Sequence, residues 1–352
     1  MRTLLPIALV VLALPGPARA GDIRQQSRFV RDTNGIEVLR VENARGVVDV
    51  RPSDDGKLHI EALKVARSPS PSLTKELADQ TVVETDQSSG TFRIRVRYPS
   101  HKVNLSLWHD LSSENMPSVE VQLAIEIPPR MAVELSTASG KIVTFGIAGR
   151  QSLKSASGDV QAEAAHGAVE VTSSSGDVTA IDVGRTSVST SSGEIACEGV
   201  RGPLRIMSSS GDVTIQGAED SIRVRTVGGD ISLARAPRGL DLTTTSGQVE
   251  VGGVSGRVRM NSTSGDVEVR LAPPLTAAEI ETSSGQLTVK LDPQVACALL
   301  ATSSSGEIDF QLPVPARTLS RGRVSAVVRG GSAPVNLRSV SGDIKVTGGG
   351  RR

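Results

Sequence analysis

The chain has 352 residues, in which 39 lysines and arginines nearly balance 38 aspartates and glutamates, and only 2% of the residues are aromatic. This length allows either two or three ordinary domains or one elongated domain that grows by adding repeats. Because the net charge is close to zero, it indicates no class of partner and gives no reason to expect nucleic-acid binding, and two cysteines are too few for a small domain held together by disulfides.

Residues 1–20 have the features of a secretory signal peptide. An early charge, Arg2, precedes an apolar run from Leu4 to Leu14, and a small-x-small cleavage pattern ends at Ala20. The apolar run is too short to span a bilayer, and no longer run follows it. We therefore expect export to the periplasm or the cell exterior, cleavage near Ala20, and a mature chain without a transmembrane segment.

Residues 21–51 are predicted to form N-terminal strands and a first coil of a repeat. In "LRVENARGVVDV", Leu39, Val41, Val48 and Val50 stand at every second position on either side of Gly46. Apolar residues at every second position face one side of a strand. The segment therefore predicts two short strands joined by a turn.

Residues 52–130 interrupt the repeat and are expected to form a small α/β insertion. Leu73 and Leu77, four residues apart after Pro71, predict a short helix. The stretch "TVVETDQSSGTFRIRVRYP" predicts a hairpin, and "SVEVQLAIEIPP" predicts a long alternating strand. A stack of coils needs a cap, because its last coil otherwise exposes unpaired strand edges and apolar core. We therefore expect this insertion to cap one end of the stack.

Aromatic and histidine residues are concentrated in one stretch of the insertion, "YPSHKVNLSLWHDLSSENMP". Tyr98, Trp108 and His109 are candidate binding residues of an exposed loop that recognises a partner. The alternative is that Trp108 plugs the end of the stack. His101 and His109 could approach each other, but a solvated pair is the commoner arrangement, so no metal site is expected.

Residues 131–312 repeat a unit of 18 residues, with few exceptions in its length. Each unit has a turn glycine, and the residues seven and five positions before it and two positions after it are nearly all apolar. These glycines, with one more in the C-terminal strands, are Gly140, Gly158, Gly176, Gly193, Gly211, Gly229, Gly247, Gly265, Gly285, Gly306 and Gly342. The pattern predicts two half-buried strands per unit, and stacking at ~4.8 Å joins their inward faces into one core. We predict an all-β fold, a single-stack β-solenoid of 18-residue coils; a β-sandwich is the alternative, but its strands and loops vary in length.

The turns have a pattern of their own. Ser or Thr stands three residues before every turn glycine, where its hydroxyl can bond backbone groups of the turn. The glycine is expected to supply a positive φ, and the acidic residue after it, as at Asp212, is expected to face solvent. The repetition therefore indicates a structural pattern rather than a catalytic one.

Cys197 and Cys297 are expected to be free, buried thiols. Both stand at inward positions of predicted strands, about five coils apart. At ~4.8 Å per coil the separation exceeds roughly 20 Å, whereas a disulfide needs α-carbons within ~7 Å.

Residues 313–347 are predicted to form closing strands. "PVPARTLSRG" breaks the period, and "VSAVVRGGSAPVNLRSVSGDIKV" resumes it, which indicates a closing hairpin. Residues 348–352 are rich in glycine and are expected to form a flexible tail.

Outward positions six and four residues before the turn glycines collect arginines in the middle of the repeat. The candidate binding residues of this basic face are Arg205, Arg223, Arg225 and Arg259. Stacking would turn them into a patch across about four coils, ~15 to 20 Å. Because arginine pairs bidentately with carboxylate and phosphate, the candidate partner is an acidic envelope polysaccharide, with an envelope protein as the other possibility. The sequence indicates no cofactor and no oligomeric state.

Positions one, three and five after the turn glycines form an acidic face, which suggests an alternative function. Its carboxylates are Asp159, Glu163, Asp177, Glu194, Glu198, Asp212, Asp230, Glu250, Asp266, Glu268, Glu307 and Asp309, opposed mainly by Arg270 and Lys290. A carbohydrate-active β-helix enzyme could use such residues. The common hydrolase, zinc and nucleotide motifs are absent from the sequence, and calcium-binding nonapeptide repeats would need Gly-Asp in both halves of each coil. We therefore expect no catalytic residues and no metal.

The "SGD-V-x-V" turns, the inserted helix and hairpin near the start, and the "VSGDI" strand near the end resemble the bacterial putative-adhesin family of β-strand-repeat proteins, a domain of unknown function. The resemblance covers roughly residues 36 to 347. It implies a β-solenoid and supplies no catalytic residues. We therefore expect an exported, non-catalytic, adhesin-like binding or scaffolding protein of the bacterial cell envelope.

Overall fold

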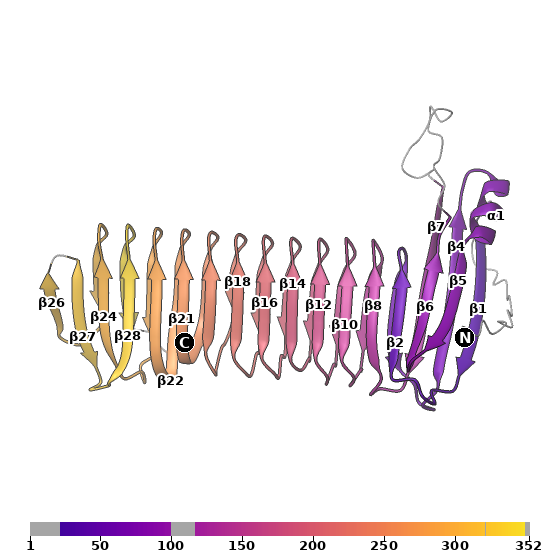
Figure 1. Cartoon of the computed structure of the whole chain (residues 1–352). Helices are drawn as coiled ribbons and strands as arrows, with labels where there is room; N and C mark the ends of the chain where they lie inside the picture. The colour runs from indigo at the N-terminus through magenta and orange to yellow at the C-terminus, as the bar shows by residue number, and fades with distance from the viewer. Residues whose placement is uncertain (1–21, 100–116, 321, 349–352) are drawn as a thin grey trace. The chain divides into compact units, whose positions relative to one another are not determined.

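The computed structural model describes residues 22–99, 117–320 and 322–348 (Figure 1). The predicted signal peptide, Trp108, His109 and residues 349–352 of the predicted tail lie outside the described residues. Strands make up 59% of the chain and helix 3%, so the predicted all-β fold is confirmed. The chain forms two compact units, unit 1 (Met1–Thr172) and unit 2 (Ser173–Arg352). Within the described ranges, no helix is long and apolar enough to cross a membrane.

Unit 1 contains two parallel ladders of short strands. One ladder runs through β2, β8 and β10, and the other through β3, β9 and β11. Their bounds are β2 (Val38–Asn43), β3 (Val47–Pro52), β8 (Ala132–Thr137), β9 (Lys141–Phe145), β10 (Gln151–Ser155) and β11 (Val160–Glu163). Leu135 pairs with Leu153, 18 residues later, and both are buried. A constant period therefore keeps the inward residues of successive coils level with one another, as the sequence predicts.

The insertion adds one coil to unit 1, and antiparallel strands beside this coil end the two parallel ladders. β6 pairs in parallel with β2, and β7 with β3, so β2 and β3 lie between this added coil and the coil of β8 and β9. β5 continues from β6, and β4 and β1 continue from β7, all in antiparallel pairing. The bounds are β1 (Ile23–Arg31), β4 (Leu58–Arg67), β5 (Val82–Ser88), β6 (Thr91–Arg97) and β7 (Ser118–Ile127). The predicted hairpin and long strand are confirmed as β5–β6 and β7.

The predicted helix is α1 (Pro71–Gln80). Proline suits the first turn of a helix because the N–H that it lacks would have no partner inside the helix there. Leu77 and Ala78 are buried in a small cluster with Ala66 of β4 and Val119 of β7. The helix thus covers the antiparallel strands at this end of unit 1.

Unit 2 continues the pattern with two longer parallel ladders. β14, β16, β18 and β20 belong to one ladder, and β13, β15, β17 and β19 to the other, while β21 and β22 are long enough to join both. The bounds are β13 (Val178–Ile181), β14 (Thr186–Thr190), β15 (Ile195–Glu198), β16 (Leu204–Ser208), β17 (Val213–Gln216), β18 (Ile222–Thr226), β19 (Ile231–Leu233), β20 (Leu240–Thr244), β21 (Val249–Ser262), β22 (Val267–Thr282) and β23 (Leu287–Leu291), and β12 (Val169–Ser173) contains the boundary between the units. The predicted solenoid architecture is thereby confirmed.

The last coils of unit 2 are stacked in a different order from their order in the sequence. β28 pairs with β22 on one side and β24 on the other, and β29 lies in the same way between β23 and β25. The hairpin β26–β27 pairs with β24 at the end of this ladder. The bounds are β24 (Cys297–Ser303), β25 (Ile308–Gln311), β26 (Ala316–Ser320), β27 (Arg323–Val328), β28 (Ala333–Ser339) and β29 (Ile344–Gly348). A closing hairpin is present as predicted, but the strands after it fill an internal level instead of ending the stack.

The turn glycines are required mainly by close stacking. The prediction of a positive φ is wrong for four turn glycines, whose backbone is not in the left-handed region. These are Gly140, Gly158, Gly306 and Gly342. A Cβ on any of these four would overlap the carbonyl oxygen of the glycine stacked beside it. The geometry that these turns share is therefore the contact between successive turns, and seven turns from Gly176 to Gly285 in addition require a positive φ.

The hydroxyl three residues before each turn glycine bonds the turn in one of two ways. Where the glycine has a positive φ, the hydroxyl donates to the carbonyl two residues later, as from Ser208 to Ser210 at 2.8 Å. Where it does not, the hydroxyl accepts from the glycine N–H, as at Thr137 and Gly140, also 2.8 Å. The predicted hydroxyl–turn bond is confirmed, and the backbone of the turn decides its direction.

Both cysteines are free and buried, as predicted. Cys197 pairs in register with Ile215, whereas Cys297 lies on β24. β14, in the same coil as β15, is seven ladder steps from β24, or ~34 Å at ~4.8 Å per step. The separation is larger than the predicted five coils because six units lie between the turns of Gly193 and Gly306 in the sequence, and the insertion of β28 adds a seventh step.

We expect neither thiol to react with a thiol reagent such as DTNB at pH 8 while the protein is folded. The thiolate is the reactive form, and burial raises the pKa of Cys197 to about 12 and also raises the pKa of Cys297. Two thiols per chain should then titrate in guanidinium. A disulfide between these two cysteines in a non-reducing peptide map would contradict the register.

Candidate functional site

The predicted basic positions of unit 2 lie in one outward column. The neighbouring strands β14, β16, β18, β20, β21, β22 and β28 each contribute the residue six positions before the turn glycine. In spatial order these residues are Ser187, Arg205, Arg223, Asp241, Arg259, Glu279 and Asn336. Two arginines are therefore adjacent near one end of the column, and arginine alternates with carboxylate further along it.

A groove of ≈ 880 Å³ follows this column. Its other side is the column eight residues before the turn glycines, which holds Arg185, Pro203, Ser221, Gly239, Arg257, Ala277 and Pro334, and Arg238 also lines it. Between the two columns, the side chains of Leu204, Ile222, Leu240 and Val258 are buried in the core. Five of the seven residues in this second column are small or are proline, and beside the long arginines they leave a trough across the strands.

The groove carries an excess of positive charge. Six arginines and two carboxylates line it, a net formal charge of +4. Arg223 Nε donates to Asp241 Oδ2 at 2.8 Å, and Arg259 Nη2 donates to Glu279 Oε2 at 2.9 Å. Within the described part of the chain, the arginines of the groove without a carboxylate partner are Arg185, Arg205, Arg238 and Arg257. These four are available to an anionic ligand without breaking an ion pair.

The structure brings together three of the four residues predicted on the basic face. Arg205, Arg223 and Arg259 line the groove, whereas Arg225 lies in the next outward column, paired in register with Met207, and is not among the lining residues. Sequence reasoning missed Arg185 and the column of small residues. The signal was present eight positions before each turn glycine, where Pro203, Gly239 and other small residues recur.

Tyr98, predicted as a binding residue of the insertion, is held inside unit 1. Its hydroxyl lies 2.6 Å from both Asn43 Oδ1 and the backbone oxygen of Arg45, and its ring packs against the cluster under α1. Burial raises the pKa of Tyr98 to about 12. These contacts give the side chain a role in attaching the insertion to the first coil. Its predicted companions Trp108 and His109 lie outside the described residues.

Aspartates of the predicted acidic face take part in the stacking of turns. Asp212 Oδ1 accepts the backbone N–H of Asp230 in the next coil, and Asp230 Oδ1 accepts that of Gln248, both at 2.8 Å. Asp177, Asp266 and Asp343 do the same at 2.8 to 2.9 Å. These carboxylates are exposed, as predicted, but the sequence did not indicate that they pair with the neighbouring coil. No group of three His, Cys, Asp or Glu side chains that could hold a metal occurs among the residues described.

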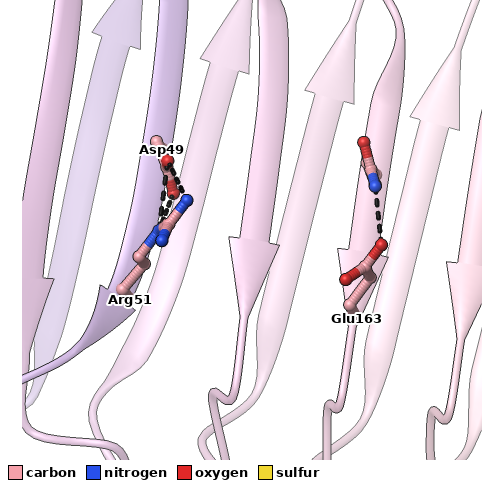
Figure 2. Close-up of polar contacts among 4 residues, drawn as sticks. Asp49, Arg51 and Glu163 are labelled. Atoms are coloured by element: carbon pink, nitrogen blue, oxygen red, sulfur yellow. Dashed lines mark hydrogen bonds and ion pairs between the residues drawn. The ribbon is translucent and has the colours of Figure 1, made fainter.

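Other outward carboxylates pair along their own strand. Figure 2 shows Asp49 on β3, which accepts three bonds from Arg51, the shortest from Nη2 at 2.9 Å, and Glu163 on β11, which accepts from Gln161 at 2.6 Å. In unit 2, Glu268 forms an ion pair with Lys290. Residues two apart on a strand, or two residues along on the neighbouring strand as Lys290 is from the level of Glu268, face the same side and can bond. Several carboxylates of the acidic face therefore have partners within the protein.

The chain matches a family model described as Toastrack DUF4097 over residues 36–238 and 235–347. No curated protein matches it. Similar solved structures are a "putative adhesin" of Bacteroides fragilis (13% identity, 76% of this chain and 96% of that chain, TM-score 0.34), a "putative lipid binding protein" of Parabacteroides distasonis (14%, 93% and 97%, 0.29) and a "putative cell adhesion protein" of Clostridium sporogenes (11%, 93% and 100%, 0.22). Likeness at this level says nothing about what this chain binds.

Proposed function

We propose that this chain, which belongs to the Toastrack DUF4097 family, is an exported, non-catalytic, adhesin-like protein. It would bind an anionic polymer of the cell envelope in the arginine-lined groove of unit 2. The groove is the observation that carries this proposal. It crosses seven neighbouring strands, so a ligand can make repeated contacts along it. The signal-peptide pattern of residues 1–20 supports export.

The chemistry of the groove favours binding over catalysis. Arginine stays protonated at physiological pH and forms paired bonds with carboxylate or phosphate, so its ground state suits the binding of an anion. The two carboxylates of the groove, Asp241 and Glu279, are each in an ion pair with an arginine. On the acidic face, Asp212 and Asp230 each accept a backbone N–H bond from the turn of the neighbouring coil. A screen of envelope glycans for new reducing ends tests the enzyme alternative, and turnover that depends on acidic-face carboxylates would replace our proposal.

We expect the triple variant Arg185→Glu/Arg205→Glu/Arg257→Glu to bind an immobilised acidic polysaccharide, polygalacturonate, at least about tenfold more weakly than the unmodified chain. The three side chains are exposed, so the melting temperature should change little. Binding by the unmodified chain should also weaken as salt is added, because salt screens exposed charges. Biolayer interferometry at two salt concentrations measures both effects.

The matched control is Arg235→Glu/Arg317→Glu/Arg323→Glu. These arginines are exposed, lie outside the groove and undergo the same change in charge. If binding depended only on net charge, the two triple variants would lose affinity equally, and the groove would not be the site.

A further inference from the structure

Building on the proposed function, we propose that the groove of unit 2 selects a linear polysaccharide that carries both carboxylates and hydroxyls, a uronate polymer. The unpaired arginines would bind its carboxylates. Asp241 and Glu279 would be specificity-determining residues that accept its hydroxyls and disfavour a ligand made only of anions.

Asp241 and Glu279 each have an oxygen to offer a ligand. Their bonds to Arg223 and Arg259 use Oδ2 and Oε2 only. The other oxygens, Oδ1 and Oε1, have no hydrogen-bond partner among the described residues. A carboxylate accepts hydrogen bonds and donates none, so it suits a sugar hydroxyl and opposes a phosphate.

The ion pairs also orient the arginines. Arg223 bonds Asp241 through Nε, which leaves both of its terminal nitrogens free to pair with a ligand carboxylate. A fixed guanidinium loses less conformational entropy on binding than a mobile one. The paired arginines can therefore contribute to binding although their charge is partly compensated.

The floor and walls of the groove fit a sugar chain better than a nucleic acid. Pro203, Gly239, Ala277 and Pro334 present small, largely apolar surfaces against which the C–H groups of a sugar ring can pack. No aromatic side chain is among the lining residues, so bases would find no stacking platform. Ser187, Ser221 and Asn336 add neutral hydrogen-bonding groups.

The length of the groove indicates a polymer. Its lining residues come from β14 to β28, six steps between neighbouring strands, or ~29 Å at ~4.8 Å per step. Unpaired arginines lie at two places along it, Arg185 and Arg205 at the first two strands and Arg238 and Arg257 at the fourth and fifth. The first and fifth strands are four steps apart, ~19 Å, so a single sugar cannot contact all four arginines, whereas an extended chain can.

The test measures binding of polygalacturonate, inorganic polyphosphate and neutral dextran to the unmodified chain and to Asp241→Ala/Glu279→Ala. We expect the unmodified chain to prefer polygalacturonate over polyphosphate at least about tenfold and to leave dextran unbound. The double variant should bind polygalacturonate at least about fivefold more weakly, because it lacks the oxygens that accept the sugar hydroxyls. It should bind polyphosphate more tightly, because it lacks the negative charges that repel phosphate. The control Glu219→Ala/Glu250→Ala removes two exposed carboxylates outside the groove and should keep the preference.

Each failure has its own signature. Absence of binding to both anionic polymers, or equal binding after the groove triple variant, would refute the proposed function itself. Binding that depends on the groove arginines but favours polyphosphate, or a double variant that binds both polymers more tightly, would refute only the selection of a uronate polymer. Melting temperatures of all variants ensure that a lost affinity is not lost folding.

Discussion

Replacing Gly229 by alanine is expected to cost on the order of 3–5 kcal/mol of stability. The added Cβ would overlap the carbonyl oxygen of Gly211 in the neighbouring coil, and the backbone at Gly229 has a φ of +92°, which alanine rarely adopts. The stacked turn cannot move aside without disturbing its own neighbour, Gly193. Urea denaturation followed by circular dichroism measures the loss.

The neighbouring residue provides the matched control. Gly228 is outside the left-handed region, and a Cβ added there would have Ser246 Oγ as its nearest neighbour at 3.7 Å. Gly228→Ala should therefore change stability by no more than about 1 kcal/mol, in either direction. Similar losses from the two variants would show that the turns do not stack as closely as described.

The second large effect is expected from Ile215→Asp. Ile215 is fully buried and pairs in register with Cys197 and Leu233, so its column is apolar on both sides. An aspartate there would lose apolar burial and leave a carboxyl group without a partner, a loss of several kcal/mol. Thermal unfolding should show a much lower transition or none.

Thr214→Asp, one residue earlier, introduces the same side chain on the outward side. Thr214 is only half-buried and faces away from the core column. We expect a change within about 0.5 kcal/mol. If the two aspartate variants melted at the same temperature, the strand phase deduced from the period would be wrong.

The period of the sequence correctly predicted which residues face the core, because it leaves little freedom in the orientation and register of the strands. Apolar residues at every second position must face one side of a strand, and a constant 18-residue unit keeps them level with the unit before. Pairs such as Cys197 with Ile215 follow directly from this. The helix after Pro71 followed from its own local signals.

The order of coils at the ends could not be read in the same way. β28 and β29 have the same inward pattern as any other coil, so they fit equally well at the end of the stack or within it. Which level they occupy depends on the length and path of the connection through β26 and β27, which the pattern does not encode. The same reasoning applies to the coil of β6 and β7 in unit 1.

The candidate site was predicted in part for a similar reason. Periodicity places Arg205, Arg223 and Arg259 on one outward column. A groove, however, depends on what the neighbouring column lacks, and the small residues that recur there have no functional groups that would indicate a binding site. The ion pairs of Arg223 and Arg259 depend on side-chain conformations that no spacing fixes.

The insertion of β28 between β22 and β24 has a consequence for how the chain is made. A nascent chain that has been synthesised only as far as β27 has an empty level between β22 and β24, and the strand edges facing that level lack their hydrogen-bonding partner. The missing strand is encoded after the hairpin of β26 and β27. Unit 2 therefore completes its folding only after β28 and β29 have been translated, and until then its C-terminal coils remain open to pairing with another chain.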